Sequence, residues 1–186
     1  MPQLQIAVIV GSIRRESINQ KLARAVMKLA PADQLTCKEL RIDDLPLYNQ
    51  DDDASPAEAV NRFKTEISAA DGLLFVTPEY NRSIPGVLKN AIDHASRPYG
   101  KSAWTDKPAG VMGASSGAPG TAMAQQHLRN ILAYLQVPVL GQPEAFIQVK
   151  NGFFGADGSI TNPETVKFLQ GWVSQYIGWV KKLAKQ

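Results

Sequence analysis

The sequence predicts an α/β fold in which a parallel sheet of five strands is covered by helices on both faces. Short apolar runs rich in β-branched residues alternate with longer segments whose apolar residues recur at helical spacing, which is the pattern of βα units. The chain has 186 residues, of which 44% are hydrophobic and 20% are charged, so its composition is that of a globular protein. No linker or change in composition divides it, and we expect one domain over residues 1–186.

The expected elements alternate from the first strand to the last helix. The strands are expected at residues 4–10, 35–41, 72–77 and 108–114, with a last strand in two pieces at 137–140 and 145–149. The helices are expected at about residues 18–29, 55–70, 84–95, 128–135 and 162–180. The second helix is expected to begin at a capping box, Ser55-Pro-Ala-Glu58, and the fifth at Asn162-Pro163-Glu164.

The order of the strands follows from their polarity. Residues 4–10 and 72–77 are the most apolar runs and should lie in the middle of the sheet, where both faces are buried. Residues 35–41 are more polar, and Pro143 interrupts the last strand, so these two should be edges. With right-handed crossovers this gives the order 2-1-3-4-5 of the flavodoxin-like three-layer sandwich. Such sheets bind ligands at the carboxyl ends of their strands, which directs attention to the loops after the first, third and fourth strands.

Charge and cysteine content exclude several classes of protein. Lys plus Arg is 20 and Asp plus Glu is 17, a net charge of +3 that suits an anionic partner such as a phosphorylated cofactor but also ordinary surface charge. No block of basic residues indicates nucleic-acid binding. With a single cysteine, Cys37, and two histidines, neither a disulfide within the chain nor a cysteine-paired zinc or three-histidine metal site is expected. No apolar run reaches the ~18 residues of a membrane span, and the first residues lack a basic signal-peptide region, so we expect a cytoplasmic protein.

The loop after the first strand has the residues of a phosphate site. Gly11 permits a sharp turn, and Ser12, Arg14, Ser17 and Asn19 add polar donors around the start of a helix. A helix start presents unpaired N–H groups and a partial positive charge, which favour a phosphate. The alternative is that Ser17 only caps the helix and the arginines are solvated.

Two further loops follow the third and fourth strands. The first contains Pro78, Glu79, Tyr80 and Asn81, a stiff turn with an aromatic side chain that can hold a flat heterocycle. The other contains small residues that let a ligand approach the backbone, namely Ser115, Ser116, Gly117 and Gly120. Each loop alone is also typical of an ordinary surface turn, but three of them at neighbouring strand ends indicate one site.

Residues Gly113-Ala-Ser115-Ser-Gly117 also match the nucleophile-elbow motif of serine hydrolases. A hydrolase of that fold places its histidine well downstream of the serine, whereas His127 is only twelve residues on and is the last histidine. We therefore expect His127 to pack against or cap its own helix. A serine hydrolase acting through Ser115 stays the third alternative.

Two motifs carry a resemblance to a known family. Gly11-Ser-Ile-Arg14-x-x-Ser17-x-Asn19, followed by Thr77-Pro-Glu-Tyr-Asn81-x-Ser-x-Pro85-Gly-x-Leu-Lys-Asn-Ala-Ile-Asp93, resembles the NADPH-dependent FMN reductase family, above all its bacterial chromate- and quinone-reducing members. The resemblance extends over essentially the whole chain. Two positions depart from it: Thr121 stands where the family has the second of two glycines, and Arg82 stands where relatives often have an aromatic residue.

The resemblance implies a flavoprotein with FMN bound in a flavodoxin-like fold. The phosphate of FMN falls on Ser12, Arg14, Ser17 and Asn19. The isoalloxazine ring falls on Pro78, Glu79, Tyr80 and Asn81 and on the loop of Ser115, Ser116, Gly117 and Gly120. It also implies a homodimer whose flavin sites lie near the interface, or a homotetramer formed from two such dimers.

The implied activity is that of an oxidoreductase in which NADPH or NADH delivers a hydride to FMN. A quinone, a free flavin or a metal oxyanion such as chromate would then take the electrons in a ping-pong sequence. No catalytic acid, base or nucleophile is expected, because the cofactor carries the chemistry. Arg14, Arg15 or Arg82 could attract the extra phosphate of NADPH or an oxyanion. The alternative is a flavodoxin-type electron carrier, but the basic charge and the lack of a Thr-x-Thr-Gly-x-Thr phosphate loop disfavour it.

Overall fold

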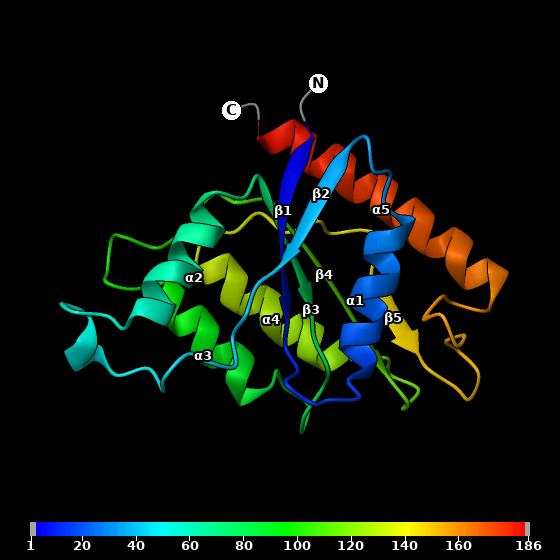
Figure 1. Cartoon of the computed structure of the whole chain (residues 1–186), viewed down its shortest axis with the longest axis horizontal. Helices are drawn as coiled ribbons and strands as arrows, with labels where there is room; N and C mark the ends of the chain where they lie inside the picture. The colour runs from blue at the N-terminus through cyan, green and yellow to red at the C-terminus, as the bar shows by residue number, and fades with distance from the viewer. Residues whose placement is uncertain (1–2, 185–186) are drawn as a thin grey trace.

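A computed structural model describes residues 3–184 as a parallel sheet with the strand order β2-β1-β3-β4-β5 (Figure 1). The strands are β1 (Leu4–Val10), β2 (Leu35–Glu39), β3 (Gly72–Val76), β4 (Ala109–Ser115) and β5 (Ala145–Gln148). The α-helices are α1 (Ile18–Leu29), α2 (Glu58–Ser68), α3 (Gly86–Ala95), α4 (Ala122–Tyr134) and α5 (Pro163–Leu183), and a short 3₁₀ helix spans Gln50–Asp52. The flavodoxin-like order predicted from strand polarity is confirmed, and each neighbouring pair of strands is parallel.

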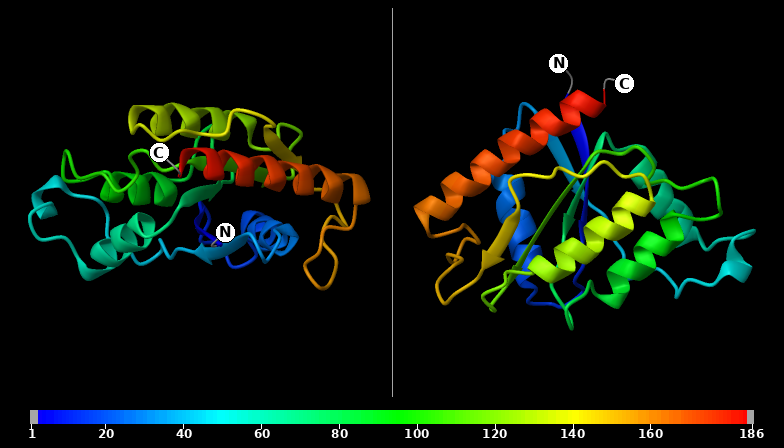
Figure 2. Two further views of the ribbon diagram at one scale, coloured as in Figure 1. Left: turned by 90° about the horizontal axis from the view of Figure 1, so that it is seen from above. Right: turned by 180° about the vertical axis from the view of Figure 1, so that it is seen from behind.

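The central strand β1 shows why the apolar runs are continuous. Ile6, Val8 and Val10 belong to the core on the side of α1 and α5, whereas Ala7 and Ile9 belong to the core on the side of α2, α3 and α4. A strand buried on both faces has no solvent side for polar residues, so its sequence does not alternate. Figure 2 shows the helices around the sheet in two further views.

The start of the second helix was predicted wrongly. α2 begins at Glu58 and has no side-chain cap at Ala57. Ser55 instead continues a series of tight turns, its N–H donating to Asp52 O at 3.0 Å. These turns begin at Asn49, whose Oδ1 accepts from Asp51 N at 3.2 Å. The turns that follow Asn49 therefore extend to Ser55, and α2 begins only after Pro56 and Ala57.

Other boundaries differ as well. α4 begins at Ala122 rather than at residue 128, because the predicted range counted only the apolar stripe from Leu128 onward. β2 ends at Glu39 rather than at residue 41, and α3 begins at Gly86 rather than at 84, directly after Pro85. Residues 137–140 form no part of β5 and contribute a single bridge, between Val139 and Ala109. The predicted start of α5 is confirmed, because Asn162 Oδ1 accepts from Thr165 N at 3.0 Å.

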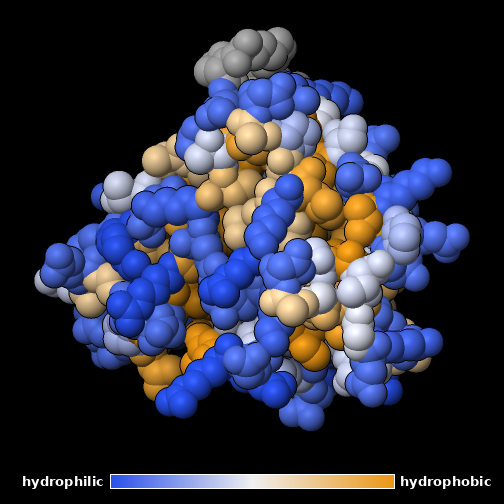
Figure 3. Space-filling model, turned by 45° about the vertical axis from the view of Figure 1, so that its right-hand side comes forward, coloured by the Kyte–Doolittle hydropathy of each residue, from blue (hydrophilic) through white to orange (hydrophobic). Residues whose placement is uncertain are grey.

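The surface of the molecule is mainly polar on the face that Figure 3 shows, with apolar residues visible between polar ones. Among residues 3–184, no helix combines the length and the apolarity needed to cross a bilayer.

Candidate functional site

The loops after β1, β3 and β4 come together at one edge of the sheet, along the lower side of Figure 1. The strand ends are bonded to one another there, with Gly11 N donating to Val76 O at 2.9 Å and Thr77 N donating to Met112 O at 3.0 Å. The predicted site residues therefore lie on three loops that share one edge, as the strand order requires.

The first loop leaves a row of backbone donors free. Within residues 3–184, the N–H groups of residues 12–16 make no hydrogen bond. Ser17 is buried, and its Oγ accepts from Gln20 N at 3.2 Å, so its side chain caps α1. Arg14 and Arg15 are exposed. Free N–H groups at the head of a helix, with guanidinium groups beside them, form an environment that favours a phosphate.

The side-chain amide of Asn19 is already hydrogen-bonded within the protein, unlike that of a direct phosphate ligand. It is 2% exposed. Its Nδ2 donates to Ala114 O at 2.9 Å, and its Oδ1 accepts from Ala114 N at 2.8 Å. The amide thus connects the start of α1 to the end of strand β4, and so connects the first loop to the third.

Glu79, in the second loop, caps the helix that follows the third loop. Its Oε2 accepts from Met123 N and from Ala124 N, both at 3.1 Å. Thr121, the residue before α4, has a left-handed backbone with φ of 72° and makes no cap bond of its own. The carboxylate of Glu79 occupies that place, where the helix dipole favours a negative charge.

The second loop ends in a tight turn over residues 80–83. Tyr80 and Ser83 exchange N–H···O bonds of 2.9 and 3.0 Å. Asn81 and Arg82 both have positive φ, 53° and 67°, which is the geometry of a type I′ turn. Asn adopts this conformation readily, but Arg does so at a cost. Tyr80 is 51% exposed and free to contact a ligand.

His127 was predicted to pack against or cap its own helix, and this was wrong. It is exposed, and its Nδ1 lies 2.8 Å from Ser83 Oγ in the turn of the second loop. Ser115 Oγ accepts from Gly117 N at 3.1 Å. Among the described residues, the predicted nucleophile Ser115 therefore has no hydrogen-bonded histidine, since His127 bonds Ser83 instead.

Two glycines near the third loop lie where neighbouring atoms leave no room for a side chain. A Cβ on Gly113 would overlap both Thr121 Oγ1 and the carbonyl oxygen of Thr77. Gly120 has φ of 57°, and a Cβ there would lie 2.7 Å from the carbonyl carbon of Phe146. Thr121 adopts the same left-handed region without being glycine, and its Oγ1 accepts from Gln125 Nε2 at 2.9 Å. Ser116 and Gly117, at the tip of the loop, are exposed.

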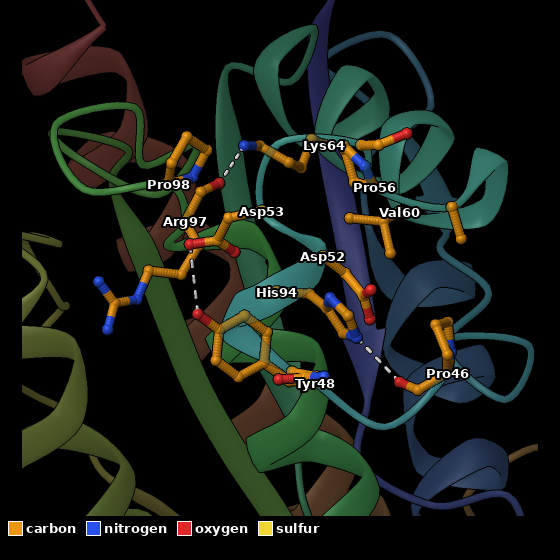
Figure 4. A pocket seen from close by; sticks show the side chains of 13 residues that line it. Pro46, Tyr48, Asp52, Asp53, Pro56, Val60, Lys64, His94, Arg97 and Pro98 are labelled. Atoms are coloured by element: carbon orange, nitrogen blue, oxygen red, sulfur yellow. Dashed lines mark hydrogen bonds between the residues drawn. The ribbon is translucent and has the colours of Figure 1, made fainter.

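A separate pocket of about 300 Å³ lies between residues 46–57, α2 and the end of α3 (Figure 4). Its polar groups bond to one another: His94 Nε2 lies 2.8 Å from Pro46 O, and Lys64 Nζ donates to Arg97 O. Burial lowers the pKa of Lys64 and raises the pKa of Tyr48. None of the predicted site residues lines this pocket.

The comparison with family profiles is decisive. The profile described as NADPH-dependent FMN reductase matches residues 4–152. The chain belongs to this family. A 2-hydroxy-1,4-benzoquinone reductase from Burkholderia sp. is 50% identical over 178 residues, which is 96% of this chain and 97% of that protein. A quinone reductase from Pseudomonas putida is 49% identical over 177 residues, 95% of this chain and 94% of that protein.

Solved structures agree with this assignment. FerB, a flavoenzyme NAD(P)H:(acceptor) oxidoreductase from Paracoccus denitrificans, is 46% identical and superposes with a TM-score of 0.93 over 97% of this chain and 98% of that one. A flavodoxin from Pseudomonas aeruginosa, 19% identical with a TM-score of 0.60, shows the shared fold alone. The FMN reductase is thus an oxidoreductase that uses FMN as cofactor and NAD(P)H as co-substrate.

The three loops fit FMN. The free N–H groups of residues 12–16 and the exposed Arg14 are donors that could bind its phosphate. The second and third loops supply an exposed aromatic ring, Tyr80, and small residues that allow close approach to the backbone. Sequence reasoning missed that Asn19, Glu79 and Ser83 reach across to other elements, because their partners lie 44 to 95 residues away along the chain.

Proposed function

We propose that this FMN reductase transfers a hydride from NAD(P)H to bound FMN and then reduces a quinone, in a ping-pong sequence. The observation that carries the proposal is the joining of three loops at one edge, through Asn19–Ala114 and through Glu79 to α4, around a row of free N–H groups. The names of the relatives at about 50% identity support a quinone as acceptor. FMN, when bound, supplies the two-electron chemistry.

The residues have two kinds of role in this proposal. Direct ligands of the flavin phosphate are Ser12, Arg14 and the N–H groups of residues 12–16, and Ser17 contributes by capping α1. Asn19 and Glu79 act as positioning residues, since their polar atoms are bonded to Ala114 and to α4. Contacts to the ring come from the remaining predicted residues: Pro78, Tyr80, Asn81, Ser115, Ser116, Gly117 and Gly120.

The range of electron acceptors, the domain boundaries, the oligomeric state and the cellular location stay predictions. Free flavin and metal oxyanions such as chromate are further acceptors that an exposed ring would allow. The whole chain, residues 1–186, is expected to form one flavin-binding domain. Two or four copies are expected to assemble into a homodimer or a homotetramer in the cytoplasm.

The test begins with the absorbance spectrum of the purified protein. We expect a yellow protein, or one that turns yellow with added FMN, and rapid consumption of NADPH when a benzoquinone is supplied. Initial rates at several quinone concentrations should give parallel double-reciprocal lines, as a ping-pong sequence requires. A protein that takes up no FMN would contradict the proposal. One that binds FMN but consumes NADPH only with a partner protein would support the electron carrier instead.

A further inference from the structure

A groove of about 450 Å³ runs from the phosphate loop into the space between α1 and the segment after β2. Ser12 and Arg14 line its inner end, so it is continuous with the proposed phosphate site. Arg24 of α1 lies on one wall, and Arg41 lies on the other. Side chains from three separate parts of the sequence therefore meet there.

The groove carries a surplus of positive charge. Four arginines, at positions 14, 15, 24 and 41, face two carboxylates, those of Glu39 and Asp43, which leaves a formal charge of +2. Both carboxylates are engaged: Asp43 Oδ1 accepts from Arg41 Nε at 2.7 Å, and Glu39 Oε1 accepts from Gln20 Nε2 at 2.8 Å. The bond from Arg41 holds the pKa of Asp43 below its ordinary value, so this acid stays ionised and paired.

The other three guanidinium groups are unpaired. Among residues 3–184, the side chains of Arg14, Arg15 and Arg24 have no hydrogen-bond or ion-pair partner. In the proposed function, Arg14 and the free N–H groups of residues 12–16 bind the flavin phosphate. The remaining two are available to a second phosphate, which guanidinium groups bind through paired donors.

The groove also has apolar walls. Val10, Leu40 and Ile42 form its inner side, and Ile13, which is 63% exposed, stands at its rim. A ligand that combines a flat apolar base with an extra phosphate would use both features.

We propose that this groove binds the adenosine end of NADPH, with the 2′-phosphate between Arg15 and Arg24. The inference rests on the proposed function and adds the place where NADPH is distinguished from NADH. NADH lacks the 2′-phosphate and so cannot make these contacts. The enzyme should therefore prefer NADPH.

The test compares Arg24→Gln with Lys21→Gln. Both substitutions remove one positive charge from α1, but Lys21 does not line the groove and pairs with Glu16 at 2.7 Å. Arg24→Gln should raise the KM for NADPH by about tenfold, the weight of one charge-assisted bond at an open site, and change the KM for NADH less than about twofold. Lys21→Gln should leave the ratio of the two constants as in the wild type.

Binding without turnover gives a second readout. In calorimetric titrations of the FMN-loaded protein, 2′,5′-ADP should bind about tenfold more tightly than 5′-AMP, and Arg24→Gln should remove this difference. Equal effects on NADPH and NADH, or equal binding of the two nucleotides, would overturn the inference. A loss of FMN affinity in Arg24→Gln as large as the loss for NADPH would also overturn it, since the groove would then serve the flavin phosphate. If the wild type consumed no NAD(P)H, the proposed function would fail, and the nucleotide titrations would still decide about the groove.

Discussion

Asn19 connects two loops of the candidate flavin site with one buried amide. Its two hydrogen bonds satisfy both backbone groups of Ala114, in a place from which water is excluded. A side chain that satisfies a buried donor and a buried acceptor together is hard to replace, because its loss leaves both unpaired. At the scale of the residue, the site therefore depends on groups that are not expected to touch the flavin.

Replacing this amide should loosen the site and the fold together. We expect Asn19→Ala to lower the free energy of unfolding by about 2–4 kcal/mol, because the N–H and the C=O of Ala114 are left unpaired in the core. Urea unfolding measures this loss, and a fluorescence titration measures the accompanying loss of FMN affinity. The control is Asn130→Ala, at an exposed position of α4, which should change neither quantity appreciably. Similar effects for the two variants would show that the amide of Asn19 has no special role.

Helix α4 takes its N-terminal cap from a different loop. The residue before it, Thr121, is held in a left-handed conformation, and Glu79 of the second loop bonds the free N–H groups in its place. The turn that follows is fixed to the same helix through Ser83 and His127. At the scale of the element, the second loop and α4 thus form one unit, joined by the hydrogen bonds of Glu79 and of Ser83.

The cap should make measurable contributions from its charge and from its hydrogen bonds. Glu79→Gln keeps an acceptor but removes the charge near the helix dipole, and should cost about 0.5–1 kcal/mol. Glu79→Ala removes both and should cost about 1–2 kcal/mol. Denaturant unfolding of the two variants checks this order. The control is Glu58→Gln, in the exposed first turn of α2, which removes a charge but no cap bond. Its loss of unfolding free energy should be smaller than that of either Glu79 variant.

The long helix α5 is connected to the centre of the sheet by Tyr176. The phenol is buried and donates to Leu73 O in β3 at 2.8 Å, while its ring stacks on Trp172 with the centroids 5.4 Å apart. Burial raises the pKa of Tyr176 well above its ordinary value, because the phenolate would lose its hydration. At the scale of the whole molecule, this contact makes the packing of α5 sensitive to high pH.

The direction of this pH dependence follows from the raised pKa. The folded state holds the phenol proton more tightly than the unfolded state, so this stability is present below about pH 10 and is lost as the pH rises above it. At about pH 8, Tyr176→Phe should be less stable than the wild type by about 1 kcal/mol, the weight of one hydrogen bond. At about pH 11 the wild type should lose more stability than Tyr176→Phe, so the stability difference between the two proteins should shrink. Urea unfolding at the two pH values measures it. Tyr99→Phe, at an 89% exposed position, should follow the wild type at both values.

Sequence patterns were enough to predict the class of fold, the order of the strands and the three loops of the candidate site. These features depend on local patterns: an apolar run such as residues 6–10 is buried on both faces, and strand ends in a parallel sheet must share an edge. The start of α1 at Ser17 and that of α5 at Asn162 were also readable, since each cap bonds within its own turn.

The hydrogen-bond partners of several of those residues, by contrast, are visible only in the folded chain. Asn19 bonds a residue 95 positions away, Glu79 caps a helix 44 positions away, and His127 contacts Ser83 rather than its own helix. Ser55 belongs to the turns that follow Asn49 and does not cap α2, which begins at Glu58. The physical reason is common to these cases: a polar side chain bonds whichever partner the packing of helices on the sheet brings within reach. That partner is set by the crossovers of the chain and not by the spacing of neighbouring residues.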